Sequence, residues 1–256
     1  AALAAEGIET FEDVAPLCRD AEVVILSLPT AAIVDSVVTG ENGILAHARP
    51  GLIIVDTSTS HPEETRKLSA LLGAKGAAMI DAPVSGGPKG AITGTMTMVL
   101  GGEEADIARV EPVLAAISAK RVHIGASGAG HVAKIINNLL CAAHLLTGAE
   151  AVRIAREAGV DPARLLDGLN AGSGRSGVTQ VNFPTWILND AYNSGFTMKL
   201  MRKDVRLAEQ LVGELGLTLP MAGLTASLWG KSENTIPDDD DFNRIVVGTI
   251  DAEEGR

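Results

Sequence analysis

Cysteine, aromatic residues and positive charge are all scarce in this chain of 256 residues. Its two cysteines, Cys18 and Cys141, are not in a paired spacing, which gives no disulfide framework or cysteine metal site and fits a reducing compartment. Lys and Arg number 21 against 32 Asp and Glu, for a formal net charge of −11. We therefore expect no nucleic-acid partner, because phosphate binding needs a basic face. An anionic metabolite is not excluded, since a few local donors decide its binding.

The apolar tracts of the first half are short, and a signal peptide is also missing. Tracts such as Val23–Leu28 and Leu52–Val55 are too short to span a bilayer, and no charged-then-apolar leader opens the chain. We expect a soluble, cytoplasmic protein without a membrane partner. The hydrophobic fraction of 46% is ordinary for a globular protein, and the length is sufficient for two domains.

Two sequence patterns divide the chain. In the first half, apolar runs alternate with amphipathic segments, which predicts an α/β sheet that is mostly parallel. From about Ser127 the strand signals largely disappear, and long helical patterns follow. The expected strands are 23–28, 52–55, 78–80, 97–100 and 121–124, and the expected helices are 33–38, 62–72, 104–117, 129–158, 162–169, 199–215 and 220–231. We predict a dinucleotide-binding domain over residues 1–126, on the resemblance given below, and an all-helical substrate and oligomerisation domain over residues 127–256.

The segment Asp81–Gly90 reads as a strand end that opens into a glycine-rich anion cradle. Within it, Ser85, Gly86 and Gly87 are consecutive, and adjacent glycines allow positive φ angles that let backbone N–H groups converge. Pro88 has no N–H to offer, so the donors should come from residues 85 to 87, with the Ser85 hydroxyl as an additional donor. A plain strand-to-loop turn is the alternative interpretation.

Lys134 is the candidate acid/base. It lies near the start of an apolar run, Val132–Leu146, that predicts a mostly buried helix, and lysine is rarely buried without a partner or a purpose. Asn137 and Asn138 follow three and four residues later, so their amides should project near the lysine and share one cleft with it. The alternative is a lysine that extends to water at the helix start. We expect His131, one turn earlier, to face solvent.

Two polar segments are better explained by structure than by chemistry. Gly172–Gly177 is expected to be a flexible loop, although Ser173 and Arg175 within it could reach an anion. The acidic run Asp238–Asp241 is expected to be a solvated turn, with a metal site as a distant second.

The beginning of the chain lacks an expected feature. Ala1–Gly7 reads as the end of a helix, and no G-x-G-x-x-G pattern precedes Val23. A doubly wound sheet normally opens with a strand, a glycine-rich turn and a helix. We therefore expect that an N-terminal segment is missing.

Taken together, four motifs resemble the β-hydroxyacid dehydrogenases, which include 3-hydroxyisobutyrate dehydrogenase and tartronate semialdehyde (2-hydroxy-3-oxopropionate) reductase. They are Asp81–Gly87, Gly94–Gly102, Gly130–Asn138 and Lys203-Asp204, in that order along nearly the whole chain. The resemblance implies a Rossmann-type doubly wound sheet, with its first strands missing here, followed by an all-α domain. It implies NAD or NADP as the cofactor, and the residues that would choose between them belong to the missing part.

The resemblance also implies roles for individual residues. Ser85, Gly86 and Gly87 match the family's substrate-carboxylate signature, Lys134 its catalytic lysine, and Asn138 its substrate-contacting asparagine. The positions Leu28, Pro29 and Thr59 resemble those that touch the dinucleotide, and Lys203 resembles the lysine that approaches the nicotinamide. Without the resemblance, Lys203 would be interpreted as a surface lysine paired with nearby acids.

The implied activity is hydride transfer between NAD(P) and the hydroxyl carbon of a small 3-hydroxy acid, of the 3-hydroxyisobutyrate or glycerate kind, with Lys134 as general acid/base. The alternative is a non-catalytic interaction module on the same fold, in which relatives have replaced the catalytic lysine. Imine reductases share the architecture but typically have another residue at that position. We expect side chains around Arg175, Phe183 and Trp186 to select the acid by shape. Long apolar runs in the helical domain favour a homodimer or homotetramer.

Overall fold

The computed structural model describes residues 5–250, so the first four residues of the expected helix end, Ala1–Gly7, lie outside the described part. The chain forms two compact units, Ala1–Lys134 and Ile135–Arg256. Helix α8 (Ala129–Glu157) begins in the first unit and continues in the second. The domain boundary between residues 126 and 127 stays a prediction.

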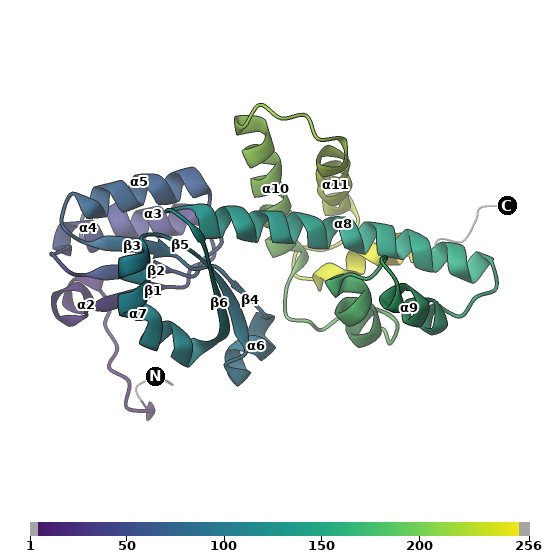
Figure 1. The fold of residues 1–256 in the computed structure, drawn as a ribbon, viewed down its shortest axis with the longest axis horizontal. Helices are drawn as coiled ribbons and strands as arrows, with labels where there is room; N and C mark the ends of the chain where they lie inside the picture. Colours follow the sequence, from purple (N-terminus) through teal and green to yellow (C-terminus); the bar gives the residue numbers. More distant parts are fainter. Residues whose placement is uncertain (1–4, 251–256) are drawn as a thin grey trace. The chain divides into compact units, whose positions relative to one another are not determined.

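The first unit is built on a mixed, six-stranded sheet (Figure 1). Strands β1 (Val23–Leu26), β2 (Ile53–Asp56) and β3 (Ala78–Asp81) are parallel neighbours. Strand β5 (Met96–Gly101) is antiparallel to β3 and to the two-residue β4 (Val84–Ser85), and parallel to β6 (Ser118–Gly125). All five predicted strands are present, which confirms the α/β interpretation. The prediction missed β4 because two residues are too few for a periodic signal.

Helices cover both faces of this sheet because successive β2 residues point to opposite sides. Ile54 packs with residues of α2 (Val14–Asp20), α3 (Ala31–Thr39), α4 (Ile44–His47) and α5 (Pro62–Gly73). Its neighbours Ile53 and Val55 pack on the other face against α7 (Glu104–Ile117). Every side chain of β2 is buried, as expected for a central parallel strand. Because β1, β2 and β3 are parallel, their carboxyl ends lie at the same edge of the sheet.

The second unit is helical throughout its described residues, as predicted. After α8 come α9 (Pro162–Ala171), a π-helix (Val178–Ile187), α10 (Met198–Glu214), α11 (Pro220–Lys231), two 3₁₀ turns (Ser232–Asn234 and Phe242–Val246) and α12 (Val247–Ile250). Its core includes Trp229 and Phe183, both fully buried. Gly148 on α8 lets Phe183 approach closely, because a Cβ there would lie 2.6 Å from the phenyl ring. The sequence did not predict the π-helix, which contains Pro184.

Helix α8 is long and apolar enough, by length and composition, to cross a membrane. Core helices of soluble proteins meet the same criterion. Ala142, Leu145, Ala149 and Val152 are fully buried and recur at helical spacing, so this face of α8 forms part of the core of the second unit.

One residue of the acidic run is less exposed than expected. Asp241 is 8% exposed, accepts hydrogen bonds from Ser194, and caps the turn at Asn243. Asp238 binds the buried guanidinium of Arg202 at 2.8 Å. The prediction of a solvated turn was therefore wrong for Asp241, which is buried, but it holds for Asp238, whose side chain is 56% exposed within a turn. Among the described residues, no group of three or more His, Cys, Asp or Glu side chains could hold a metal ion.

Candidate active site

Two of the predicted site residues meet within the first unit. Lys134 Nζ donates a hydrogen bond to Ser85 Oγ at 3.0 Å. Lys134 lies on the second turn of α8 and is 8% exposed, while Ser85 ends β4 and is partly buried. The lysine is therefore directed at the glycine-rich loop and does not extend to bulk water. An ammonium beside a hydroxyl can both bind an anion and exchange a proton with it.

The glycine-rich loop has the backbone conformation that its sequence suggested. Gly86 has φ 126° and Gly87 has φ 60°, both in the region that glycine adopts most easily. Gly87 also begins a short helix, α6 (Gly87–Thr93), with Pro88 in its first turn. The sequence predicted a loop here and not a helix. The helix provides further possible donors, because the first N–H groups of a helix have no partner within the helix. Gly86 and Gly87 are exposed, so a small anion can reach them.

The start of α8 is fixed to the end of β3 by a buried carboxylate. Asp81 accepts hydrogen bonds from the backbone N–H of Gly128 at 2.8 Å and of His131 at 2.9 Å. Gly130 allows this approach, since a Cβ there would lie 2.6 Å from the Val99 carbonyl oxygen and 2.8 Å from that of Asp81. The helix that carries Lys134 therefore packs directly on the sheet from which the Ser85 loop leaves.

The prediction that His131 faces solvent was wrong. Its side chain is fully buried, with Nδ1 2.7 Å from Thr65 Oγ1 and Nε2 2.9 Å from the Ser58 carbonyl oxygen. Sequence spacing placed His131 at a helix start but could not show that the first turn of α8 packs on the sheet.

The predicted dinucleotide positions lie where two parallel strands end. Leu28 and Pro29 follow β1, and Thr59 follows β2, at the edge of a doubly wound sheet where nucleotides usually bind. The Leu28 N–H donates to Ser58 Oγ at 2.9 Å, which links the two segments. In the same loop the hydroxyl of Ser60 is buried without a hydrogen-bond partner. An edge with exposed residues after β1 and an unsatisfied hydroxyl after β2 fits a polar cofactor.

The remaining two predicted residues lie in the second unit, around a buried carboxylate. Asp204 on α10 is 2% exposed and accepts a hydrogen bond from Asn138 Nδ2. Lys203 Nζ lies 3.1 Å from the other oxygen of this carboxylate. Asn137 donates to Asn138 Oδ1 at 3.0 Å, so the orientation of the Asn138 amide is set by both neighbours. The sequence pattern alone indicated no role for Asp204.

One of the three side chains expected to select the acid lies in the core. Phe183 is fully buried in the core of the second unit, so that expectation was wrong for this residue. Arg175 is exposed and donates to the Gly172 carbonyl oxygen, as a loop residue does. Trp186 is partly buried on the π-helix.

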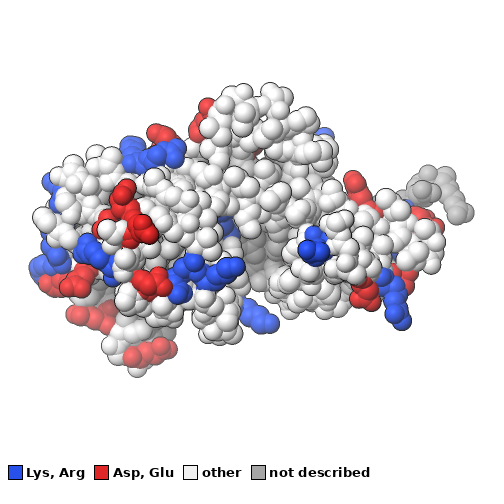
Figure 2. All heavy atoms as spheres, in the orientation of Figure 1, with Lys and Arg blue, Asp and Glu red and all other residues white. Residues whose placement is uncertain are grey.

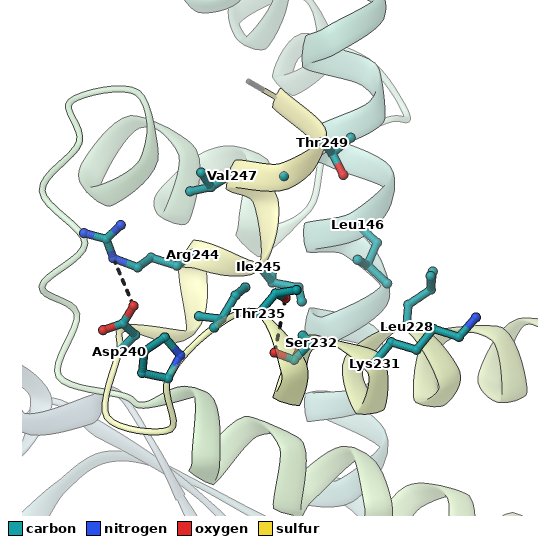
Figure 3. Close-up of a pocket in the computed structure, with 13 residues that line it drawn as sticks. Leu146, Leu228, Lys231, Ser232, Thr235, Asp240, Arg244, Ile245, Val247 and Thr249 are labelled. Carbon is teal, nitrogen blue, oxygen red and sulfur yellow. Dashed lines mark hydrogen bonds and ion pairs between the residues drawn. The ribbon is translucent and has the colours of Figure 1, made fainter. Parts of the chain in front are cut away.

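A cavity of about 540 Å³ in the second unit contains none of the predicted site residues (Figure 3). It is lined by residues of α8, α11 and the C-terminal turns, including Leu146, Leu228, Ser232 and Ile245. Its lining is mainly apolar, and Arg244 and Asp240 form an ion pair beside it. No sequence signal had indicated this cavity.

Comparisons with known proteins agree with the motifs. Residues 1–125 match the model of the NAD-binding domain of 6-phosphogluconate dehydrogenase, and residues 128–247 match that of the NAD-binding domain of NADP-dependent 3-hydroxyisobutyrate dehydrogenase. The chain is 34% identical to 2-(hydroxymethyl)glutarate dehydrogenase of Eubacterium barkeri over 90% of this chain and 76% of that protein. The chain belongs to the β-hydroxyacid dehydrogenase family.

Two further members of the family are similar over most of the chain. NAD-dependent L-serine dehydrogenase of Pseudomonas aeruginosa is 33% identical over 89% of this chain and 78% of its own length. The structure of Mycobacterium tuberculosis 3-hydroxyisobutyrate dehydrogenase with L-serine superposes with a TM-score of 0.87, at 34% identity, covering 95% of this chain and 84% of that one. Like other β-hydroxyacid dehydrogenases, this protein is an NAD(P)-dependent oxidoreductase that transfers a hydride to or from a small hydroxy acid.

Proposed function

We propose that this β-hydroxyacid dehydrogenase oxidises acids of the form HOCH₂–CH(R)–COO⁻, with Lys134 as the group that moves the alcohol proton. The 3.0 Å hydrogen bond between Lys134 and Ser85 is the observation that carries the proposal. It places a cation and a hydroxyl beside the exposed backbone of Gly86 and Gly87. An acid held there by its carboxylate would have its alcohol within a few atoms of the ammonium.

The names of the three relatives support this substrate class. 3-Hydroxyisobutyrate, L-serine and 2-(hydroxymethyl)glutarate differ in one substituent but share a primary alcohol on the carbon next to the one that bears the carboxylate. The residues that would hold the shared part are present in this chain. The substituent R is the part that the relatives vary, and it remains to be identified by assay.

The proposed roles divide between binding and proton transfer. Ser85, Gly86 and Gly87 bind the carboxylate, which orients the alcohol carbon. NAD or NADP, when bound, accepts the hydride in oxidation and supplies it in reduction. Lys134 takes the alcohol proton in oxidation as a neutral amine, and returns it in reduction as an ammonium. Leu28, Pro29 and Thr59 would contact the cofactor from the edge of the sheet.

The roles of Asn138 as a substrate contact and of Lys203 as a cofactor contact rest on the resemblance of their motifs to the family. The ion pair and hydrogen bond at Asp204 support them, because a side chain fixed by a buried carboxylate presents its remaining donor in one direction.

We further propose that the protein acts in the cytoplasm as a homodimer or homotetramer. Exposed apolar side chains gather at the α10–α11 connection and along α11, namely Leu215, Leu217, Leu219, Met221 and Leu224. Figure 2 shows few charges on the surface over these two helices. Exposed apolar side chains with few charges around them are typical of a protein interface. Light scattering during size-exclusion chromatography measures the assembly directly.

A substrate panel tests the function. The full-length protein is assayed by nicotinamide absorbance with NAD and with NADP against 3-hydroxyisobutyrate, L-serine, glycerate and 2-(hydroxymethyl)glutarate. Lactate, whose alcohol is on the carbon adjacent to the carboxylate, and 2-methyl-1,3-propanediol, which lacks the carboxylate, are the controls. Turnover restricted to the 3-hydroxy acids supports the proposal. Equal turnover of either control compound would contradict it.

A further inference from the structure

A buried histidine that the proposed chemistry does not use lies one turn before Lys134. His131 is fully buried, and its ring makes two hydrogen bonds to different segments of the first unit. Because a carbonyl oxygen can only accept, Nε2 donates to the Ser58 carbonyl oxygen. Nδ1 bonds to the hydroxyl of Thr65 on α5. A fully buried imidazole with both nitrogens bonded has a fixed orientation.

The Ser58 end of this contact continues toward the predicted dinucleotide positions. Ser58 Oγ accepts from the Leu28 N–H at 2.9 Å, and the Ser58 N–H donates to Asp56 Oδ1 at 3.0 Å. Asp56 Oδ2 lies 3.9 Å from His131 Nε2. A chain of short contacts therefore runs from the segment after β1, through the segment after β2, to the imidazole.

The backbone of His131 is held as firmly as its side chain. Its N–H donates to Asp81 at 2.9 Å. Asp81 lies four residues before Ser85, and His131 lies three residues before Lys134, so this bond joins the two segments close to the Lys134–Ser85 pair. Asp81, Asp56 and Ser58 are all at most 5% exposed, so water does not compete for these bonds. The network thus fixes the backbone one turn before Lys134 and the strand end four residues before Ser85.

We propose that His131 is a positioning residue for Lys134. It fixes the first turn of α8 against the ends of β2 and β3. In this way it holds the Lys134 ammonium at Ser85, in a fixed position relative to the segments after β1 and β2 that are proposed to bind the cofactor. The proposal rests on the proposed function of Lys134. It adds that the geometry of the proton transfer depends on the Thr65 hydroxyl and the Ser58 carbonyl, two groups of buried residues.

Thr65→Val tests this, because valine keeps the shape of threonine and removes only the hydroxyl, which bonds to Nδ1 and also lies 3.2 Å from the His61 carbonyl oxygen one turn earlier. Thr65→Ser restores the hydroxyl, and Thr39→Val is the matched control, since Thr39 is on α3 and its hydroxyl bonds only within its own helix. We expect kcat of Thr65→Val to fall about tenfold, as small misplacements of reacting groups do. We expect its cofactor dissociation constant, measured by calorimetry, to stay within about twofold of wild type. Thr65→Ser and Thr39→Val should keep wild-type kcat.

A crystal structure of each variant gives a readout that does not need activity. In Thr65→Val the Lys134 Nζ to Ser85 Oγ distance should exceed the hydrogen-bond range of about 3.2 Å, and it should remain 3.0 Å in the two other variants. Wild-type kcat and an unchanged distance in Thr65→Val would overturn the proposal. Equal loss of kcat in Thr65→Ser would also overturn it, because the hydroxyl would then not be the cause.

His131→Gln covers the case in which Thr65→Val does not fold. Glutamine places an amide donor near the position of Nε2, so the bond to Ser58 can persist while the Thr65 bond is lost. Its kcat should lie between wild type and His131→Ala, and kcat of His131→Gln no higher than that of His131→Ala would count against the proposal. Failure of the proposed function is distinguishable, because then the wild-type protein oxidises none of the acids while the distances still report on His131.

Discussion

The ammonium of Lys134 donates to the hydroxyl of Ser85 across 3.0 Å, which joins the second turn of α8 to the end of β4. The two residues are 49 positions apart in the sequence, and both belong to the first compact unit. Their meeting follows from Asp81, whose carboxylate binds the first turn of α8 at the end of β3. The glycine-rich loop and Lys134 are thus held together by the end of a strand.

Ser85→Ala removes the hydroxyl that accepts from Lys134. We expect KM for the hydroxy acid to rise about tenfold, because one hydrogen bond to a charged group contributes about 1.5–3 kcal/mol. Initial-rate kinetics at saturating cofactor measure this. Ser36→Ala, an exposed change on α3, should leave KM unchanged. An unaltered KM in Ser85→Ala would remove Ser85 from the carboxylate site.

Gly130→Ala should destabilise the first unit. The new Cβ would lie 2.6 Å from one backbone oxygen and 2.8 Å from another, and the backbone must shift to relieve the overlap. We expect a loss of about 1–3 kcal/mol in the free energy of unfolding, measured with urea. Gly168→Ala on α9 is the control, because nothing lies within 4 Å of its Cβ, and it should be neutral or stabilising by up to about 1 kcal/mol. Equal stability of both variants would show that the contact at Gly130 relaxes without cost.

Asp204→Ala should loosen the second unit around Asn138. The substitution removes a buried acceptor shared by Asn138 and Lys203. We therefore expect the free energy of unfolding to fall by about 1–3 kcal/mol. Thermal unfolding measures it, with Asp167→Ala, exposed on α9, as the control. If the two variants have the same melting temperature, the Asp204 carboxylate contributes nothing to stability.

Cys18 should react slowly with thiol reagents in the folded protein. Burial raises the pKa of its thiol, an effect that the nearby Arg49 guanidinium partly offsets. The contribution of this thiol to stability is therefore complete below the pKa of the unfolded thiol and is lost as the pH rises through the higher folded pKa. At pH 8 we expect labelling of Cys18 to be slower than that of the half-buried Cys141, and equal in denaturant. Mass spectrometry locates the label, and faster native labelling of Cys18 would refute this prediction.

Much of this architecture could be predicted because it depends on local pattern. The strand Ile53–Asp56 is a short run that is buried throughout, and the helix that begins at Pro62 has proline in its first turn and a capping residue before it. The position of His131 could not be predicted, because its burial depends on Asp81 and Thr65, which are distant in sequence. The same is true of Asp204, whose importance appears only when Asn138 is placed beside it. Family motifs identified Lys134 and Ser85, but the hydrogen bond between them is a property of the folded chain.

The turnover of Lys134→Ala in the full-length protein tests the central claim most directly. Loss of a positioned acid/base lowers kcat by about 10²–10⁴-fold. We predict a loss in this range with the best hydroxy acid, cofactor affinity by calorimetry close to wild type, and partial recovery of turnover when a small primary amine is added. Turnover near the wild-type value in Lys134→Ala would contradict the assignment of the proton transfer to this residue.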